Sequence, residues 1–176
     1  MALVAEFWLL GRLATPVGTL LVVSDTAQRL RALDWADHEA RLQRLLRLQY
    51  RQEISLQNAV VPSAIEKALA AYFAGQLTAL NDLPIELGGT PFQRAVWTGL
   101  RAIPAGTTQT YGGLAAAIGR PSAVRAVGLA NGANPIAIVV PCHRVIGANG
   151  TLTGYAGGLP RKQWLLAHEG RWPPAT

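Results

Sequence analysis

"IPAGTTQTYGGLAAAIGRPSAVRAVGLANG", residues 103–132, is the stretch that decides the fold. Its small and apolar residues predict two short helices, at about 111–118 and 122–131, separated at 119–121 by a glycine and a proline. Glycines and alanines in the first helix let the two helices approach each other closely. The spacing predicts a helix-turn-helix, whose second helix enters a DNA groove, although any tight helical hairpin would use the same residues.

The second of these helices has an almost smooth surface. Arg125 is flanked by Ala123, Val124, Ala126 and Val127, whereas a helix that reads the major groove usually carries several long polar side chains. A smooth helix suits the shallow minor groove and the DNA backbone, with Arg125 as a wedge. The candidate DNA contacts on the second helix are Ser122, Ala123, Arg125 and Ala126.

A domain boundary precedes these helices. Thr90 and Gln93 form a predicted capping box, with a proline at the first helical position, at the start of "TPFQRAVWTGLRAI". Just before it, "LNDLPIELGGT" (80–90) has the proline and paired glycines of a linker. We therefore expect an α/β domain at residues 1–86 and a mainly helical domain at residues 87–176.

The first domain has its own pattern of strands and helices. Two strands are predicted around 17–23 and 29–35, joined by a polar turn. "ADHEARLQRLLRLQY" then has leucines at helical spacing. A second helix is expected to begin at a capping box formed by Ser63 and Glu66 and to stop at Gly75.

Charge is unevenly distributed between the two predicted domains. Residues 1–86 carry eight Lys/Arg and nine Asp/Glu, whereas residues 87–176 carry eight Lys/Arg and one acid, Glu169. The excess of positive charge indicates either an ordinary soluble surface or a partner that is a polyanion such as nucleic acid. Because residues 87–176 contain no other acid, we expect the Glu169 carboxylate to have a function.

Composition excludes several classes of protein. One cysteine among 176 residues can form neither an intramolecular disulfide nor a zinc site of several thiolates. No apolar run is long enough to span a bilayer, and the start "MALVAEFWLLGR" has a glutamate and no basic leader. We expect a soluble, cytoplasmic protein with no metal and no cofactor.

The single cysteine lies in "NPIAIVVPCHRVIGANG", residues 134–150. The apolar run 136–140 predicts a buried strand that Pro141 ends, which would place Cys142 at a strand end. A lone cytosolic cysteine is often only a small core residue. A neighbouring base would instead make Cys142 a nucleophile.

His143 is the candidate base, acting through a bridging water because adjacent residues of an extended chain point in opposite directions. Such a histidine needs an acceptor on its other ring nitrogen, and Glu169 fits that role. His168 is a competing base, although a histidine near a helix C-terminus ordinarily interacts with the helix dipole.

Residues 90–170 closely resemble the bacterial O6-alkylguanine-DNA alkyltransferases, also called methylated-DNA–protein-cysteine methyltransferases. The resemblance is carried by "PCHRV", by the "NP" upstream and by "HEG" downstream. The N-terminal part matches loosely, in "TPVGTLLVVSD". The resemblance to this family implies a ribonuclease H-like N-terminal domain, a DNA-binding helix-turn-helix and irreversible transfer of an alkyl group from guanine O6 to the protein. O4-alkylthymine is expected as a second substrate.

The resemblance also implies roles for individual residues. Cys142 matches the alkyl acceptor, His143 the base that acts through water, and Glu169 the carboxylate that orients the histidine. Asn134 matches the residue that braces the active-site turn. Tyr111 matches the tyrosine whose hydroxyl faces guanine N3 and supports protonation of the leaving base, and which also lies against the DNA backbone, so it is a candidate DNA contact as well.

Further matches concern the flipped base and its pocket. Arg125 matches the side chain that fills the space left by the flipped nucleotide, and Val145 matches a backbone contact to the guanine edge. Tyr155 and Ala156 match the loop that walls the pocket. Many relatives carry serine in place of Ala156, so a hydroxyl donor is absent there.

The expected partner is double-stranded DNA with an alkylated guanine, bound by a monomer. Cooperative binding along DNA stays open. Two other readings of the site remain, and both differ from alkyl transfer in what happens to the thiol. One is a cysteine hydrolase with Cys142, His143 and Glu169 as its triad, and the other is a DNA lesion binder without transfer activity.

Overall fold

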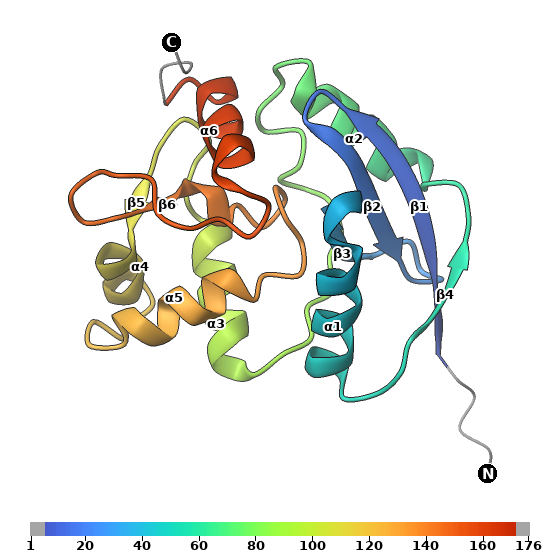
Figure 1. Cartoon of the computed structure of the whole chain (residues 1–176), viewed down its shortest axis with the longest axis horizontal. Helices are drawn as coiled ribbons and strands as arrows, with labels where there is room; N and C mark the ends of the chain where they lie inside the picture. The colour runs from blue at the N-terminus through green and yellow to red at the C-terminus, as the bar shows by residue number, and fades with distance from the viewer. Residues whose placement is uncertain (1–5, 172–176) are drawn as a thin grey trace.

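The computed structural model describes residues 6–171. Its N-terminal part, the sheet unit, is a four-stranded sheet of order β3-β2-β1-β4 with two helices (Figure 1). The β1–β2 and β2–β3 pairs are antiparallel, and β1–β4 is parallel. The elements of the sheet unit are β1 (Phe7–Thr15), β2 (Gly18–Ser24), β3 (Leu30–Trp35), a 3-10 turn (Ala36–His38), α1 (Glu39–Tyr50), β4 (Ser55–Asn58) and α2 (Ser63–Phe73).

The two helices of the sheet unit cover opposite faces of the sheet. In β2, Leu21 and Val23 pack with Leu42 and Leu46 of α1. The alternate residues of that strand, such as Leu20, face the other side and pack with the buried side of α2. Both faces are therefore apolar because strand side chains alternate between them.

The C-terminal part, the helical unit, consists of short helices around a two-stranded parallel pair, β5 with β6 (Figure 1). Its elements are α3 (Pro91–Arg101), β5 (Gln109–Thr110), α4 (Tyr111–Ala117), α5 (Val124–Gly132), a 3-10 turn (Cys142–Arg144), β6 (Val145–Ile146) and α6 (Leu159–His168). None of the helices in the described residues is long and apolar enough to cross a membrane.

Several predicted elements are confirmed. The strands expected at 17–23 and 29–35 are β2 and β3, and the helices expected at 111–118 and 122–131 are α4 and α5. The capping box at the start of α3 is also confirmed, because the Thr90 side chain accepts from the Gln93 backbone N–H while the Gln93 side chain accepts from the Thr90 N–H.

Residues 74–90, between the two units, contain turns, bends and one isolated bridge, from Leu30 to Ile85. The division at 86/87 stays a prediction. The expectation about a leader rests partly on residues 1–5, which lie outside the described residues.

The strand predicted at 136–140 is wrong. Only Ile136 makes a bridge, to Leu33 of β3, and the following residues turn, with the Val140 N–H donating to the Ile136 carbonyl at 3.0 Å. Ile138 has φ of +69°, in the left-handed region. The run is apolar because it is buried between the two units, and burial alone gives the same composition as a buried strand.

Two smaller expectations also differ. α2 begins at Ser63 itself, with Pro62 in the capping position, so the serine is one residue too late to cap and no capping bond forms. Strand β1 was not predicted, although it pairs with β2 along seven residues.

The two units dock through backbone and side-chain bonds. Leu33 of β3 donates its N–H to the Pro135 carbonyl and accepts from the Ala137 N–H, both at 2.9 Å. Arg161 of α6 pairs with Asp37 at 2.9 Å. These contacts fix the segment that leads into Cys142 against the edge of the sheet unit.

Candidate active site

Cys142 is the first residue of a 3-10 turn. It does not lie at the end of a strand, where the sequence predicts it. Asn134 holds the chain that leads to it: its side-chain amide donates to the Val140 carbonyl at 2.7 Å and accepts from the Ile136 N–H at 3.0 Å. The Cys142 N–H donates to the same Val140 carbonyl at 2.8 Å. Asn134 therefore closes the loop that presents the thiol.

The thiol lies in a desolvated environment. Cys142 is only 6% exposed. Burial raises the pKa of the Cys142 thiol, while a hydrogen bond from Asn134 and the positive charge of Lys162 act in the opposite direction. The resting group is the neutral thiol, so a nucleophilic role requires a base.

His143 is buried beside Cys142 in sequence and is held by Glu169. Its Nε2 lies 2.9 Å from Glu169 Oε1, and both side chains are inaccessible to solvent. Burial lowers the pKa of His143, although Glu169 opposes this. The carboxylate can only accept, so Nε2 carries the proton and donates it to Glu169.

The other ring nitrogen of His143 is free to act as a base. Nδ1 is buried and has no hydrogen-bond partner among the described residues. With Nε2 protonated, Nδ1 carries the basic lone pair of the neutral imidazole. The predicted arrangement of a histidine held by Glu169 is thus present in the structure.

Arg144 balances the charge of Glu169. Its Nε donates to Oε2 at 2.9 Å and its Nη2 to Oε1 at 2.8 Å, while Nη1 donates to the Ile103 carbonyl at 2.7 Å. Burial would raise the pKa of Glu169, but the hydrogen bonds and charges of His143 and Arg144 hold it well below its usual range. Glu169 is therefore ionised throughout the physiological pH range.

His168, the competing base, has a different place. Its Nε2 donates to the Tyr72 carbonyl at 2.7 Å, and its ring stacks on Trp164 with centroids 4.9 Å apart. It belongs to an aromatic contact between α2 and α6 and holds the units together.

Lys162 is a site residue that sequence reasoning counted only as a surface charge. It is fully buried, and its Nζ donates to the Val145 carbonyl at 2.6 Å and to the Thr153 carbonyl at 3.0 Å. Burial lowers the pKa of Lys162 to about 8, while the charge of Cys142 raises it. The signal was its position seven residues before Glu169, the residue that caps the end of α6, because a spacing of seven residues places two side chains on the same side of a helix.

Two of the predicted pocket residues adjoin this cluster, since Val145 bonds Lys162 and the charge of Cys142 acts on the Tyr155 hydroxyl. Val145 lies in β6, and its carbonyl oxygen accepts a hydrogen bond from Lys162. The Tyr155 hydroxyl is buried without a partner in the part of the chain that the structure describes, and burial raises its pKa. Ala156 is exposed.

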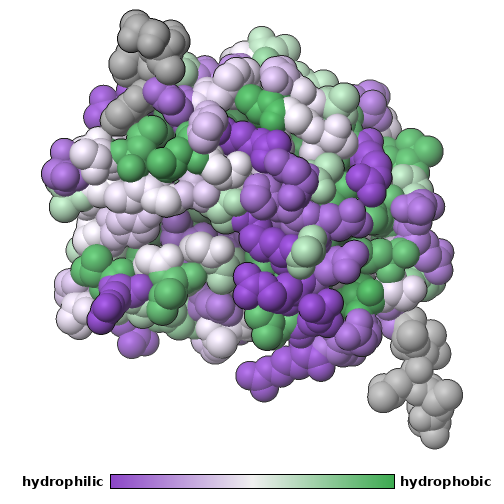
Figure 2. All heavy atoms as spheres, in the orientation of Figure 1, coloured by the Kyte–Doolittle hydropathy of each residue, from purple (hydrophilic) through white to green (hydrophobic). Residues whose placement is uncertain are grey.

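The candidate DNA contacts lie on the outer surface of α4 and α5. Tyr111 and Arg125 line one shallow hollow, together with Val124, Gly128 and Leu129. The Tyr111 hydroxyl is hydrogen bonded to Thr153 Oγ1 at 3.0 Å. Figure 2 shows hydrophobic side chains over this pair of helices, and Leu129 is 77% exposed.

Other predicted contacts are accessible on the same helix pair. Ser122 and Ala126 are exposed and Ala123 is half-buried. No described ligand contacts them, so their roles stay predictions.

The positive charge of the helical unit is partly internal. Arg144 and Lys162 are buried, and Arg161 pairs with Asp37 of the sheet unit. Five cations of the eight are left at or near the surface: Arg94, Arg101, Arg120, Arg125 and Arg171.

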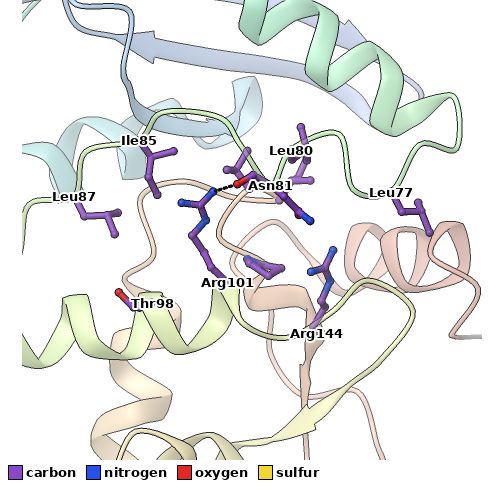
Figure 3. Close-up of a pocket in the computed structure, with 11 residues that line it drawn as sticks. Leu77, Leu80, Asn81, Ile85, Leu87, Thr98, Arg101 and Arg144 are labelled. Atoms are coloured by element: carbon purple, nitrogen blue, oxygen red, sulfur yellow. Dashed lines mark hydrogen bonds between the residues drawn. The ribbon is translucent and has the colours of Figure 1, made fainter.

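A separate pocket of about 480 Å³ lies behind the site, between the linker and α3. Figure 3 shows the Arg101 side chain pointing to Asn81, whose carbonyl accepts from it at 3.0 Å, and Arg144 among the other residues that line the pocket. Cys142 and His143 do not line it. It is therefore not the entrance to the candidate active site.

Comparison with known proteins supports the resemblance seen in the sequence. Two profiles match the chain, "6-O-methylguanine DNA methyltransferase, ribonuclease-like domain" over residues 9–87 and "6-O-methylguanine DNA methyltransferase, DNA binding domain" over residues 91–171. A methylated-DNA–protein-cysteine methyltransferase of Salmonella typhimurium is 58% identical over 160 residues, which is 90% of this chain and 94% of that protein.

Solved structures agree with the sequence relatives. The crystal structure of Mycobacterium tuberculosis OGT in complex with DNA has a TM-score of 0.77 and 42% identity, covering 94% of this chain and 96% of that one. The O6-methylguanine-DNA methyltransferase of Pyrococcus kodakaraensis has a TM-score of 0.71 and 27% identity, covering 93% and 99%. The chain therefore belongs to the 6-O-methylguanine DNA methyltransferase family.

Proposed function

We propose that this protein repairs DNA by direct reversal of damage, transferring the alkyl group from guanine O6 to Sγ of Cys142. The observation that carries the proposal is the buried cysteine followed by His143, whose Nε2 is held by Glu169 and whose Nδ1 is unpartnered among the described residues. The names of the relatives, which are methyltransferases that act on methylated DNA and a protein cysteine, support it.

The proposed reaction begins with the thiol. His143 Nδ1 takes the Cys142 proton through a bridging water, and Glu169 stabilises the imidazolium that forms. The nearby ammonium of Lys162 favours the thiolate by its charge. By this route the thiolate forms only when His143 accepts the proton. That suits a thiol whose pKa is raised by burial.

The thiolate then attacks the alkyl carbon. The S–C bond forms as the C–O6 bond breaks, and the electron pair stays on the guanine. The Tyr111 hydroxyl supplies a proton to guanine N3 and is reprotonated from solvent. The product is a thioether, and the chain has no second cysteine that could accept the group, so each molecule reacts once.

We infer that α4 and α5 act as a helix-turn-helix in the minor groove. Arg125 would occupy the stack after the damaged nucleotide flips out, with Tyr111, Ser122, Ala123 and Ala126 against the DNA. Flipping costs a few kcal/mol of lost stacking, and an inserted side chain offsets part of it.

The flipped base would be bound by the loop that follows the cysteine. The Val145 main chain would contact the guanine edge, with its carbonyl accepting from an amino group there, and Tyr155 and Ala156 would form the wall. The same pocket would accept O4-alkylthymine, which presents an alkylated oxygen in a smaller ring.

The test is the intact mass of the protein before and after mixing with a duplex that carries one O6-methylguanine, followed by peptide mapping. We expect one methyl group per molecule, on the Cys142 peptide, with Cys142→Ala as the unreactive control that still binds the duplex. Unmodified protein with DNA still methylated indicates a lesion binder. Repeated turnover without a stable adduct indicates a cysteine hydrolase.

A further inference from the structure

A side chain of the sheet unit reaches into the buried charge cluster of the helical unit. The hydroxyl of Tyr72, on α2, donates to Glu169 Oε1 at 2.8 Å. The two residues are 97 positions apart in the sequence, and Tyr72 is fully buried. The hydroxyl therefore bonds the carboxylate that also holds His143.

The position of Tyr72 is fixed on several sides. It lies on the buried face of α2 with Ile65 and Leu69. Its ring makes an edge contact with His168, with centroids 5.1 Å apart, and its own carbonyl accepts from His168 Nε2. Main chain and side chain of Tyr72 thus hold two consecutive residues at the end of α6, His168 and Glu169.

The hydrogen bond falls on the oxygen that matters for His143. Oε1 of Glu169 accepts from Tyr72, from His143 Nε2 and from Arg144 Nη2, whereas Oε2 accepts only from Arg144 Nε. Three donors share one oxygen, so each added donor reduces the negative charge that the others feel.

The Tyr72 hydroxyl stays a donor over the whole working pH range. Burial and the negative charge of Glu169 both raise the pKa of Tyr72 far above its ordinary value. The charged or titratable groups around His143 are Lys162 from α6, Glu169 at the cap of that helix, Arg144 and Cys142 from the 3-10 turn, and, through Glu169, Tyr72 from α2.

We propose that Tyr72 is a positioning residue for alkyl transfer, through which the sheet unit sets the orientation of the Glu169 carboxylate and the negative charge that it presents to His143. The inference rests on the proposed function, in which His143 is the base. Removing the hydroxyl should leave more negative charge facing His143, which stabilises the imidazolium and raises the pKa of His143.

The test compares wild type with Tyr72→Phe, which removes the hydroxyl and keeps the ring. The matched control is Tyr50→Phe, because the Tyr50 hydroxyl is also partly buried in the sheet unit but bonds Arg31 and Glu86. Reaction with free O6-benzylguanine is followed by intact mass from pH 5 to pH 9, which excludes effects on DNA binding. The ring of His143 is titrated by NMR in the same proteins.

We expect Tyr72→Phe to move the acid limb of the rate profile and the pKa of His143 upward by about half a unit or more, which is roughly a threefold slower reaction on that limb. Tyr50→Phe should match wild type. Site-specific 3-fluorotyrosine at position 72, whose hydroxyl is a stronger donor, should move both quantities downward, and it keeps the packing if Tyr72→Phe folds poorly.

If wild type transfers the alkyl group but all these proteins show the same pH–rate profile and the same His143 titration, the inference about Tyr72 is overturned and the proposed function stands. If wild type forms no adduct at Cys142, the proposed function fails. The His143 titration then still reports whether Tyr72 controls that group.

Discussion

Three buried groups decide the chemistry at Cys142: the thiol itself, the imidazole of His143 and the ammonium of Lys162. Burial works against the charged form of each of them, because it raises the pKa of Cys142 and lowers those of His143 and Lys162. The resting site is therefore close to neutral apart from the Arg144–Glu169 pair and Lys162. In the proposed reaction, moving one proton from the Cys142 sulfur to the His143 imidazole would create the reactive thiolate.

Lys162 gives a prediction about stability and pH. Its pKa of about 8 in the folded protein is below the roughly 10.4 of an exposed lysine. Below pH 8 both states carry the proton and the full cost of burying the charge is present. As pH rises from 8 to about 10.4, the folded protein loses the proton first, so its free energy of unfolding should increase by about 3 kcal/mol.

This increase should be absent in Lys162→Met, and urea unfolding of both proteins at pH 7.5 and pH 10 measures it. The difference between the two proteins isolates Lys162 from other titrating groups. An equal change in both would show that Lys162 does not titrate there.

The individual site residues could be predicted to different degrees from the sequence. Cys142, His143 and Glu169 lie within a short segment with few other reactive groups, so few combinations were available. Tyr72 had no such signal, because its pattern with Ile65 and Leu69 is only that of a buried helix face. Its hydrogen bond to Glu169 depends on where the end of α6 lies in the fold, 97 positions away in the sequence.

At the scale of single elements, local capping chemistry predicted one of two helix starts correctly, and the residue in the N-cap position decided the outcome. The Thr90 box predicted α3 correctly. The Ser63 box failed because Pro62, with its fixed φ, already occupies the capping position. The run 136–140 failed because its burial between two units imitates the composition of a strand.

α5 carries the prediction for DNA. Arg125 is exposed near its start and lines the hollow shared with Tyr111. If its guanidinium fills the space of the flipped nucleotide, Arg125→Ala should slow repair of a duplex by about 10- to 100-fold, the equivalent of part of the unstacking cost. Reaction with free O6-benzylguanine should be unchanged.

Arg120→Ala is the matched control, because it removes an exposed arginine from the turn between α4 and α5 without touching the hollow. Single-turnover rates on duplex and free base separate the two roles. Equal slowing of both substrates by Arg125→Ala would contradict insertion into the stack.

At the scale of the whole molecule, the number of cations counted in the sequence is larger than the number available to contact DNA phosphates. Eight cations in residues 87–176 leave five that are exposed or half-buried and unpaired with an acid among the described residues, since Arg144 and Lys162 are buried and Arg161 pairs with Asp37. The logarithm of DNA affinity should therefore fall against the logarithm of salt concentration with a slope no steeper than about −4.5.

Fluorescence anisotropy with Cys142→Ala and a lesion duplex at several salt concentrations measures this slope. A slope near −7 would mean that Arg144, Lys162 and Arg161 leave their present partners to meet phosphates. No slope at all would remove electrostatic attraction from the account of DNA binding.

The bonds between the two units also bear on how such a gene can change by recombination. A crossover in the linker at residues 74–90 would join a sheet unit from one ancestor to a helical unit from another. The backbone bonds of Leu33 would survive such an exchange, because every residue there except proline offers the same groups. The Arg161–Asp37 and Tyr72–Glu169 contacts would survive only if both parents carried the same partners. The two halves are therefore expected to be inherited together, and functional hybrids should come mainly from parents that share these pairs.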